Sequence, residues 1–191
     1  MRTGRVEAFS DGVIAILITI MVLELRVPHG STAAALHPLV PIFLTYVLSF
    51  VNLGIYWNNH HHMLHAAERI NGKVLWANLH LLFWLSLVPF VTGWMGENHF
   101  APLPTAVYGA VLLLCGVAFT ILLRVLVAAQ IPGSKLAVAV GGDVKGKLSM
   151  ALYAVAIPLA FVNQGIADAL YVVVALMWLV PDRRIESLLS D

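Results

Sequence analysis

Four histidines stand close together in the first half of the chain, at positions 60, 61, 62 and 65. An imidazole can ligate a metal ion, carry a proton or donate a hydrogen bond. His61 and His65 have the i, i+4 spacing of helical metal ligands, and Glu68 could join them from the next turn. The one cysteine, Cys115, is distant, and no second paired motif completes a four-ligand set. A metal site, a haem ligand and a buried polar network are the three interpretations, and the network fits best; no metal or cofactor is expected.

A second polar group precedes the first long apolar run. Arg5, Ser10 and Asp11 come directly before a run of aliphatic residues that continues from position 13 to 23. An ionised carboxylate beside hydrocarbon is costly unless it finds a partner inside a helix bundle or lies at the headgroup level. Asp11 therefore needs donors from neighbouring helices.

These polar groups are expected to meet, because consecutive membrane helices run in opposite directions and bring their ends to the same depth. The second apolar segment ends, and the third begins, on the side where the first begins. We predict a network that satisfies Asp11 and supports the first helix; its members are Arg5, Phe9, Ser10, Asp11, Trp57, His60, His61, Asn78 and His80.

The composition is that of a polytopic membrane protein. Hydrophobic residues make up 60% of the 191 residues and charged residues only 11%, and the mean hydropathy is +0.88. We expect one all-α membrane domain over residues 1–191. No basic cluster interleaved with aromatics suggests nucleic acid, and no catalytic triad, phosphate loop or helical zinc-protease motif suggests an enzyme.

Six apolar segments follow one another along the chain. They are predicted at Phe9–Leu25, Pro41–Asn59, Val74–Met95, Thr105–Val127, Leu148–Val162 and Ile166–Val180. The last two are short, and Pro158 interrupts the fifth, so this pair either crosses the bilayer or forms a hairpin that does not fully cross.

The distribution of basic residues predicts the orientation. With six spans, Arg26 is the only basic residue on one side of the membrane. The same side has the carboxylates Glu24, Glu97 and Asp168, which could concentrate cations there. The other side collects Arg2, Arg5, Arg69, Lys73, Arg124, Lys135, Lys145, Lys147, Arg183 and Arg184. The positive-inside rule then places both termini in the cytoplasm of a cell-membrane protein.

The first helix has a column of aliphatic side chains on one face. At about 100° per residue, Ile16, Ile20 and Leu23 fall within roughly 60° of one another, with Thr19 on their flank, while Asp11 points elsewhere. By periodicity alone such a face is lipid-facing or core.

Three motifs, which follow one another along the chain, indicate a different role for this face. Arg5-Val6-Glu7-Ala8-Phe9-Ser10-Asp11, Trp57-Asn58-Asn59-His60-His61, and Asn78 with the stretch from Leu82 to Phe90 together resemble the transmembrane-protein-175 family of potassium channels in its prokaryotic single-repeat form. The resemblance covers about the first half of the chain.

The resemblance implies a passive, potassium-preferring cation channel. In this family four first helices surround the axis of a homotetramer, and aliphatic rings constrict the pore in place of a carbonyl filter. When the family's pore is carried over to this sequence, Ile16 forms the narrowest ring, and Ile20 and Leu23 form further layers. Thr19 either offers an oxygen to the ion or bonds back to a carbonyl of its own helix. The expected partners are the bilayer, permeant potassium ions and further copies of the chain.

The residues also allow two other functions. A proton or metal-ion transporter would depend on Asp11 and the histidines of the second and third helices, because titratable groups inside a bundle relay protons. A structural membrane scaffold would carry no flux.

Overall fold

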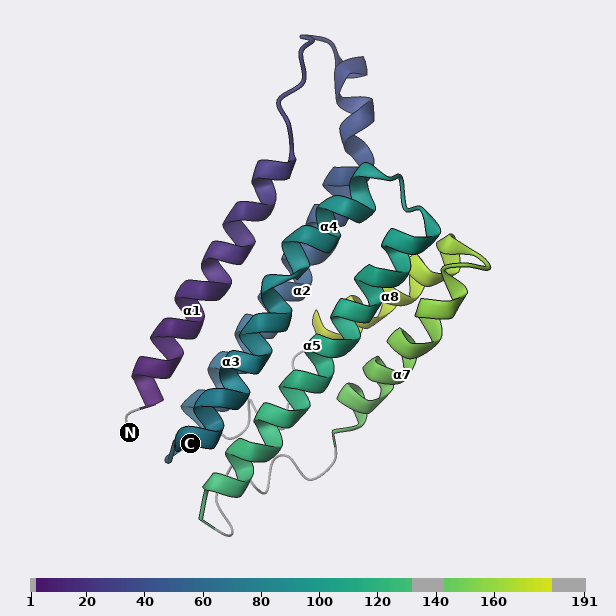
Figure 1. Ribbon diagram of the computed structural model, residues 1–191. Coiled ribbons are helices and arrows are strands. Elements are labelled where there is room, and N and C mark those ends of the chain that lie inside the picture. Colours follow the sequence, from purple (N-terminus) through teal and green to yellow (C-terminus); the bar gives the residue numbers. More distant parts are fainter. Residues whose placement is uncertain (1–2, 132–142, 180–191) are drawn as a thin grey trace.

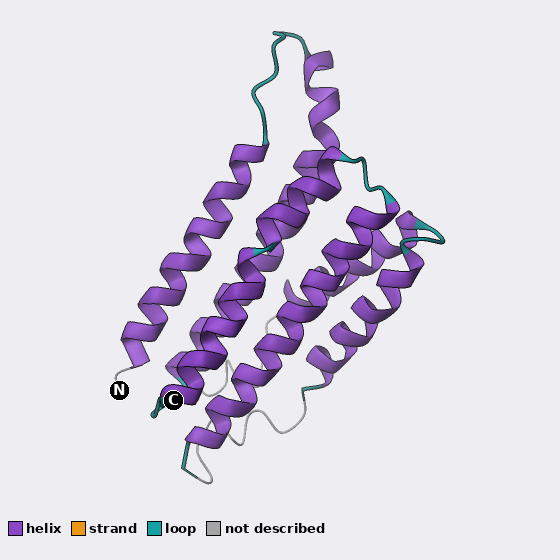
Figure 2. Cartoon of the chain, viewed as in Figure 1, coloured by secondary structure: helices purple, strands orange, loops and turns teal. Residues whose placement is uncertain are grey.

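The structure is a computed structural model that describes residues 3–131 and 143–179, and within them all regular structure is helical (Figures 1 and 2). Its elements are α1 (Thr3–Ile20), η1 (Met21–Glu24), η2 (Ala33–Leu39), α2 (Val40–His65), α3 (Gly72–Ser86), α4 (Val88–Glu97), α5 (Pro102–Ala129), α7 (Val144–Leu159) and α8 (Gln164–Leu179). The all-α architecture is confirmed.

The first helix is longer at its start than the apolar pattern predicts. α1 begins at Thr3 and includes the polar residues before position 13. Ser10 is buried within this helix, and its hydroxyl is satisfied by donating to the carbonyl of Val6 at 2.8 Å. At its other end the chain tightens into the 3-10 turn η1. Residues three apart eclipse one another in such a turn, so Leu23 follows directly above Ile20.

The third predicted segment is two helices joined at Leu87. Pro89 has no amide hydrogen and its ring crowds the carbonyl of the residue four positions earlier, which ends α3 at Ser86. α4 then starts with the proline in its first turn, where the missing donor costs nothing. At the opposite end, the Asn71 side chain caps α3 by accepting from the amide of Val74 at 3.1 Å.

The helices run up and down beside one another (Figure 1). α1 packs against α2 and α3, α2 packs against α4, and α5 contacts α3, α4, α7 and α8. Large buried side chains of this interior include Leu53, Leu81, Leu85, Tyr108 and Leu112.

Among the described residues, four helical stretches are long and apolar enough to cross a membrane: Thr3–Glu24, Ala33–His65, Gly72–Glu97 and Pro102–Ala129. α7 and α8 have 16 residues each in the described chain, about 24 Å at 1.5 Å per residue, against about 30 Å of hydrocarbon. α7 ends one residue after Pro158. The six predicted segments all correspond to helices, and full crossing by the last two stays a prediction.

The described basic residues follow the predicted division between the two ends of the bundle. The starts of α1, α3 and α7 and the end of α5 share the lower end in Figure 1, and Arg26 follows η1 at the other end. These elements and the α2–α3 turn carry Arg5, Arg69, Lys73, Arg124, Lys145 and Lys147; Arg2, Lys135, Arg183 and Arg184 lie outside the described residues.

Candidate functional site

A buried chain of hydrogen bonds joins α1, α2 and α3. His60 Nε2 lies 2.7 Å from Asn78 Oδ1, and Asn78 Nδ2 donates to Ser10 Oγ at 2.9 Å. The three side chains are at most 2% exposed. Because the amide oxygen can only accept, His60 carries a proton on Nε2. Ser10 passes its own hydrogen to the Val6 carbonyl, so these bonds fix α1 to both neighbours. The other ring nitrogen of His60, Nδ1, is buried and has no hydrogen-bond partner among the described residues.

Asp11 is bound by tryptophan and not by histidine. The indole Nε1 of Trp57 donates to Asp11 Oδ1 at 3.0 Å across the α1–α2 contact. The Trp57 ring stacks on His61 with a centroid distance of 6.1 Å. This side of the network is more open, with Trp57 44% exposed, and the indole supplies the donor that Asp11 requires.

His61 has a partner, Glu7, that is not among the predicted members of the network. Its Nδ1 lies 2.7 Å from Glu7 Oε1, one helical turn before Asp11 on α1. The i, i+4 spacing of Glu7 and Asp11 was the available signal, since it places both carboxylates on the same side of the helix. Two carboxylates of α1 therefore face two aromatic side chains of α2.

Three predicted members lie apart from these contacts. His80 accepts a hydrogen bond from Trp84 Nε1 at 3.0 Å, one turn later on its own helix. Phe9 is 54% exposed, and no hydrogen bond or ion pair joins Arg5 to another of the described residues. Their part in holding α1 stays a prediction. Within residues 3–131 and 143–179, no three His, Cys, Asp or Glu side chains are grouped so that they could hold a metal ion.

The opposite sides of the first helix differ sharply in burial. Ile14, Leu17 and Met21 are at most 6% exposed and pack into the bundle. The other side is uncovered: the exposed fractions are 54% for Phe9, 60% for Ile16, 40% for Ile20 and 75% for Leu23. We call these four residues the apolar stripe of α1. Ile16, Ile20 and Leu23, which the helical projection grouped, therefore share an open surface.

Thr19 bonds back to its own helix. Its hydroxyl is within 3.0 Å of the Ala15 carbonyl and 2.9 Å of the Ile16 carbonyl, to which it donates its hydrogen. The oxygen keeps lone pairs beside the stripe. Back-bonding and an oxygen offered to an ion are therefore compatible.

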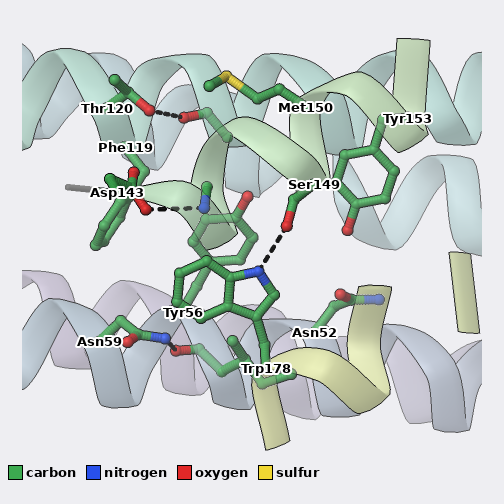
Figure 3. A pocket seen from close by; sticks show the side chains of 13 residues that line it. Asn52, Tyr56, Asn59, Phe119, Thr120, Asp143, Ser149, Met150, Tyr153 and Trp178 are labelled. Carbon is green, nitrogen blue, oxygen red and sulfur yellow. Dashed lines mark hydrogen bonds between the residues drawn. The ribbon is translucent and has the colours of Figure 1, made fainter. Parts of the chain in front are cut away.

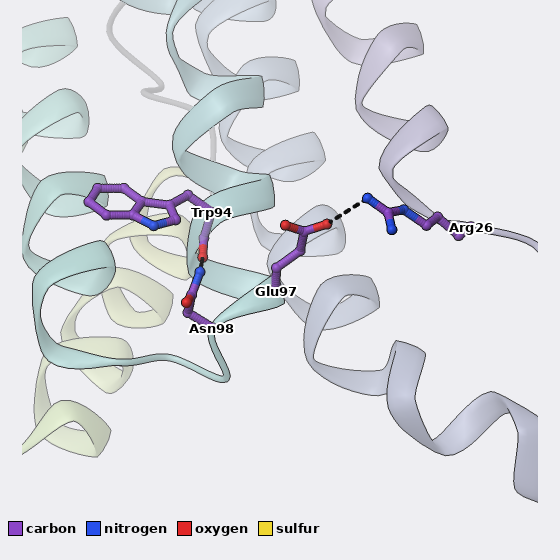
Figure 4. Close-up of polar contacts among 4 residues, drawn as sticks. All are labelled: Arg26, Trp94, Glu97 and Asn98. Atoms are coloured by element: carbon purple, nitrogen blue, oxygen red, sulfur yellow. Dashed lines mark hydrogen bonds and ion pairs between the residues drawn. The ribbon is translucent and has the colours of Figure 1, made fainter.

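The upper end of the bundle carries an ion pair between the chain after η1 and the end of α4. Arg26 lies 3.3 Å from Glu97 (Figure 4), and the two side chains are 81% and 45% exposed. Exposed pairs of this kind add little stability, but this one offsets the charge of Glu97. Concentration of cations by the carboxylates at this end stays a prediction.

Comparison with known proteins shows which family this chain belongs to. The model of the family described as endosomal/lysosomal potassium channel TMEM175 matches residues 5–89, from the start of α1 into α4. A potassium channel of Chryseobacterium sp. (strain P1-3) is 51% identical over 191 residues, which is all of both chains. The chain belongs to the TMEM175 family. The predicted family is thus confirmed, and the matched segment holds the whole hydrogen-bonded network.

Two further relatives of the TMEM175 family bear on fold and function. The crystal structure of a lysosomal potassium-selective channel TMEM175 homolog from Chamaesiphon minutus superimposes with a TM-score of 0.81 at 28% identity, covering 93% of this chain and 96% of that one. The human endosomal/lysosomal proton channel TMEM175 is 39% identical over 92 residues, 41% of this chain and 18% of the human protein.

Proposed function

We propose that this TMEM175-family chain forms a potassium-preferring cation channel whose pore is lined by α1. The observation that carries the proposal is the apolar stripe, which is uncovered in the single chain while the opposite side of the same helix is buried. One such helix cannot enclose a path, so a ring of copies is required. Relatives named as potassium channels support the choice of ion.

The stripe acts on water and on the ion's hydration shell. Rings of Ile16, Ile20 and Leu23 exclude water when they close and make an ion shed part of its shell when they open. Potassium holds its shell less tightly than sodium, so partial dehydration favours potassium without a carbonyl filter. The oxygen of Thr19 lies among these layers.

The assembly we propose is a homotetramer in the cell membrane with both termini in the cytoplasm. The charge difference between the two ends supports the orientation. In this assembly the bonds of Ser10 to Asn78 and of Asp11 to Trp57 hold α1 at a fixed rotation about its axis. A turn of the helix would take the stripe off the pore axis, so these bonds maintain the constriction.

A proton or metal-ion transporter is the second candidate. The contact of His61 with Glu7, close to Asp11, places titratable groups where a proton could pass between α1 and α2. The human relative is named as a proton channel. This mechanism depends on His61 and Asp11 and not on the aliphatic stripe.

Ion flux from liposomes separates the two candidates. Potassium and sodium efflux is measured for the native chain, for Ile16→Asn and for the control Val22→Asn. Val22 is another exposed aliphatic residue, with an exposed fraction of 44%, but it lies off the stripe. A polar ring holds water in the constriction, so Ile16→Asn should raise the leak several-fold and weaken the potassium preference. Val22→Asn should behave as the native chain.

The opposite pattern would support the transporter. If Ile16→Asn leaves flux unchanged while His61→Gln or Asp11→Asn abolishes a pH-driven flux in a normally assembled protein, the hydrophobic pore is wrong. Size-exclusion elution and circular dichroism of each variant establish that assembly is normal.

A further inference from the structure

A small cavity lies between α2, α5, α7 and α8, apart from the contacts of α1 (Figure 3). Its volume is about 50 Å³. A buried water molecule needs about 10–15 Å³ of such space, so the cavity has room for about three. No part of the ion path proposed above uses it.

The cavity lies behind the face of α2 that contacts the first helix. The residues of α2 that line it are Asn52, Ile55, Tyr56 and Asn59. Their i, i+3, i+4, i+7 spacing is that of one helix face. At about 100° per residue, Trp57 and His61, which contact α1, lie on the other side of α2. Whatever occupies the cavity therefore supports α2 from the side opposite α1.

Most polar side chains of the lining are already paired within the protein. Ser149 donates to a carbonyl of its own helix and accepts from Trp178 Nε1 at 2.8 Å. Thr120 donates to a carbonyl one turn earlier on α5. Asp143 is the one charged residue among the described residues that line the cavity, and it caps α7 by accepting from the amide of Gly146 at 2.8 Å (Figure 3).

Two phenol hydroxyls of the lining are left without a partner. Tyr56 and Tyr153 form no hydrogen bond with another of the residues that the structure describes, and neither hydroxyl is sealed off by protein atoms. Asn59 uses its Nδ2 to donate to the Ile55 carbonyl at 2.8 Å, and its side-chain oxygen has no donor among the described residues. The cavity thus offers two donors and an acceptor, which in a dry space would lose their hydrogen bonds to water.

We propose that this cavity binds a cluster of about three water molecules, which links Tyr56 and Asn59 of α2 with Tyr153 of α7. Water fits the size of the site, and it also fits the chemistry because each molecule both donates and accepts. A hydrocarbon occupant would leave both hydroxyls unpaired. An ion would meet no available charge, since the carboxylate of Asp143 is engaged as a helix cap. The cluster joins α7 to α2.

Hydroxyl-radical footprinting with X-rays tests the proposal on the purified, assembled protein without any measurement of ion flux. The pulse splits water, and the radicals oxidise side chains that lie next to a water molecule. Mass spectrometry then gives the rate of oxidation at each residue. Tyr153, Tyr108 and Tyr171 form a matched set: they are 4%, 0% and 0% exposed, and of the three Tyr153 alone lines the cavity. Tyr153 should be oxidised several-fold faster than the other two.

A larger residue at Gly116 should displace the water. A Cβ added there would lie 3.5 Å from Met150 Cγ and 3.8 Å from the Tyr56 hydroxyl. Both are ordinary contacts, so Gly116→Ala fits, and Gly116→Leu fills more of the cavity. Oxidation of Tyr153 should slow in Gly116→Ala and fall to the rate of Tyr108 in Gly116→Leu. Gly54→Leu, where an added Cβ meets nothing within 4 Å, should keep the native rate. If Gly116→Leu does not assemble, Gly116→Ala still decides.

Either of two results would overturn the proposal. If Tyr153 of the native protein is oxidised no faster than Tyr108 and Tyr171, the cavity holds no water. If Tyr153 is oxidised rapidly but at an unchanged rate in the assembled Gly116 variants, the radicals reach it by another route and the cavity is not their source.

Discussion

At the scale of single residues, the polar side chains of α1 divide into a closed group and an open one. Ser10, Asn78 and His60 are fully buried and hydrogen-bonded in sequence. Asp11 and Trp57 bond at a more exposed depth. The closed group suits a structural role because an unpaired member would be left in a dry interior.

Replacing the central member of the buried group should destabilise the protein. Asn78→Leu keeps the approximate size of the side chain but leaves the His60 donor without its acceptor and Ser10 without its donor. We expect a loss of about 1–3 kcal/mol in the free energy of unfolding, measured by denaturant titration in micelles. Asn98→Leu, at an exposed asparagine, is the control; equal losses in the two variants would contradict the argument.

At the scale of elements, the close approach of α4 to α2 depends on a small residue. A Cβ added at Gly96 would lie 2.6 Å from Thr45 Oγ1 and 2.8 Å from the Ile42 Cα. The second atom belongs to the backbone and cannot turn away, so any larger residue pushes the helices apart.

Gly96→Ala should therefore lower the thermal stability of the protein. Overpacking of this kind costs about 1–3 kcal/mol. Gly54→Ala on α2, whose Cβ meets nothing within 4 Å, should be neutral or stabilising by up to about 1 kcal/mol through helix propensity. Thermal unfolding of both variants checks the sign. A stabilising Gly96→Ala change would show that α4 can move away at no cost.

At the scale of the whole molecule, the apolar stripe links the single chain to the assembly. Its four side chains are uncovered, and the proposed tetramer buries them around an axis. The chain offers a low background for testing this by disulfide formation, because its cysteine, Cys115, is buried.

Cysteines placed on the stripe should cross-link between copies. Leu23→Cys should give linked dimers under mild oxidation, seen on non-reducing gels, because adjacent copies bring this position together near the axis. Trp76→Cys on α3, at an equal exposure of 75%, should not. Equal cross-linking at both positions, or at neither, would argue against a ring centred on α1.

The sequence by itself determined the class of the protein and the position of its helices. Apolar runs long enough for a bilayer located all six segments, and three motifs identified the family. The ends of the elements were harder to predict: α2 continues to His65, past the predicted Asn59, because His60 finds a buried partner in Asn78 on another helix. Pro89 lay within a predicted span, and the structure breaks the helix before it.

Only the tertiary structure decided which polar groups pair. Asp11 is bound by Trp57 and His61 by Glu7, while His80 turns to Trp84 on its own helix. Helical periodicity fixes which side of its own helix a residue occupies. The rotation and depth of each helix relative to its neighbours come from the packing of the whole bundle. Residues such as Asp11 and Trp57, 46 positions apart in the sequence, form a hydrogen bond only when both the rotation and the depth of their helices are right.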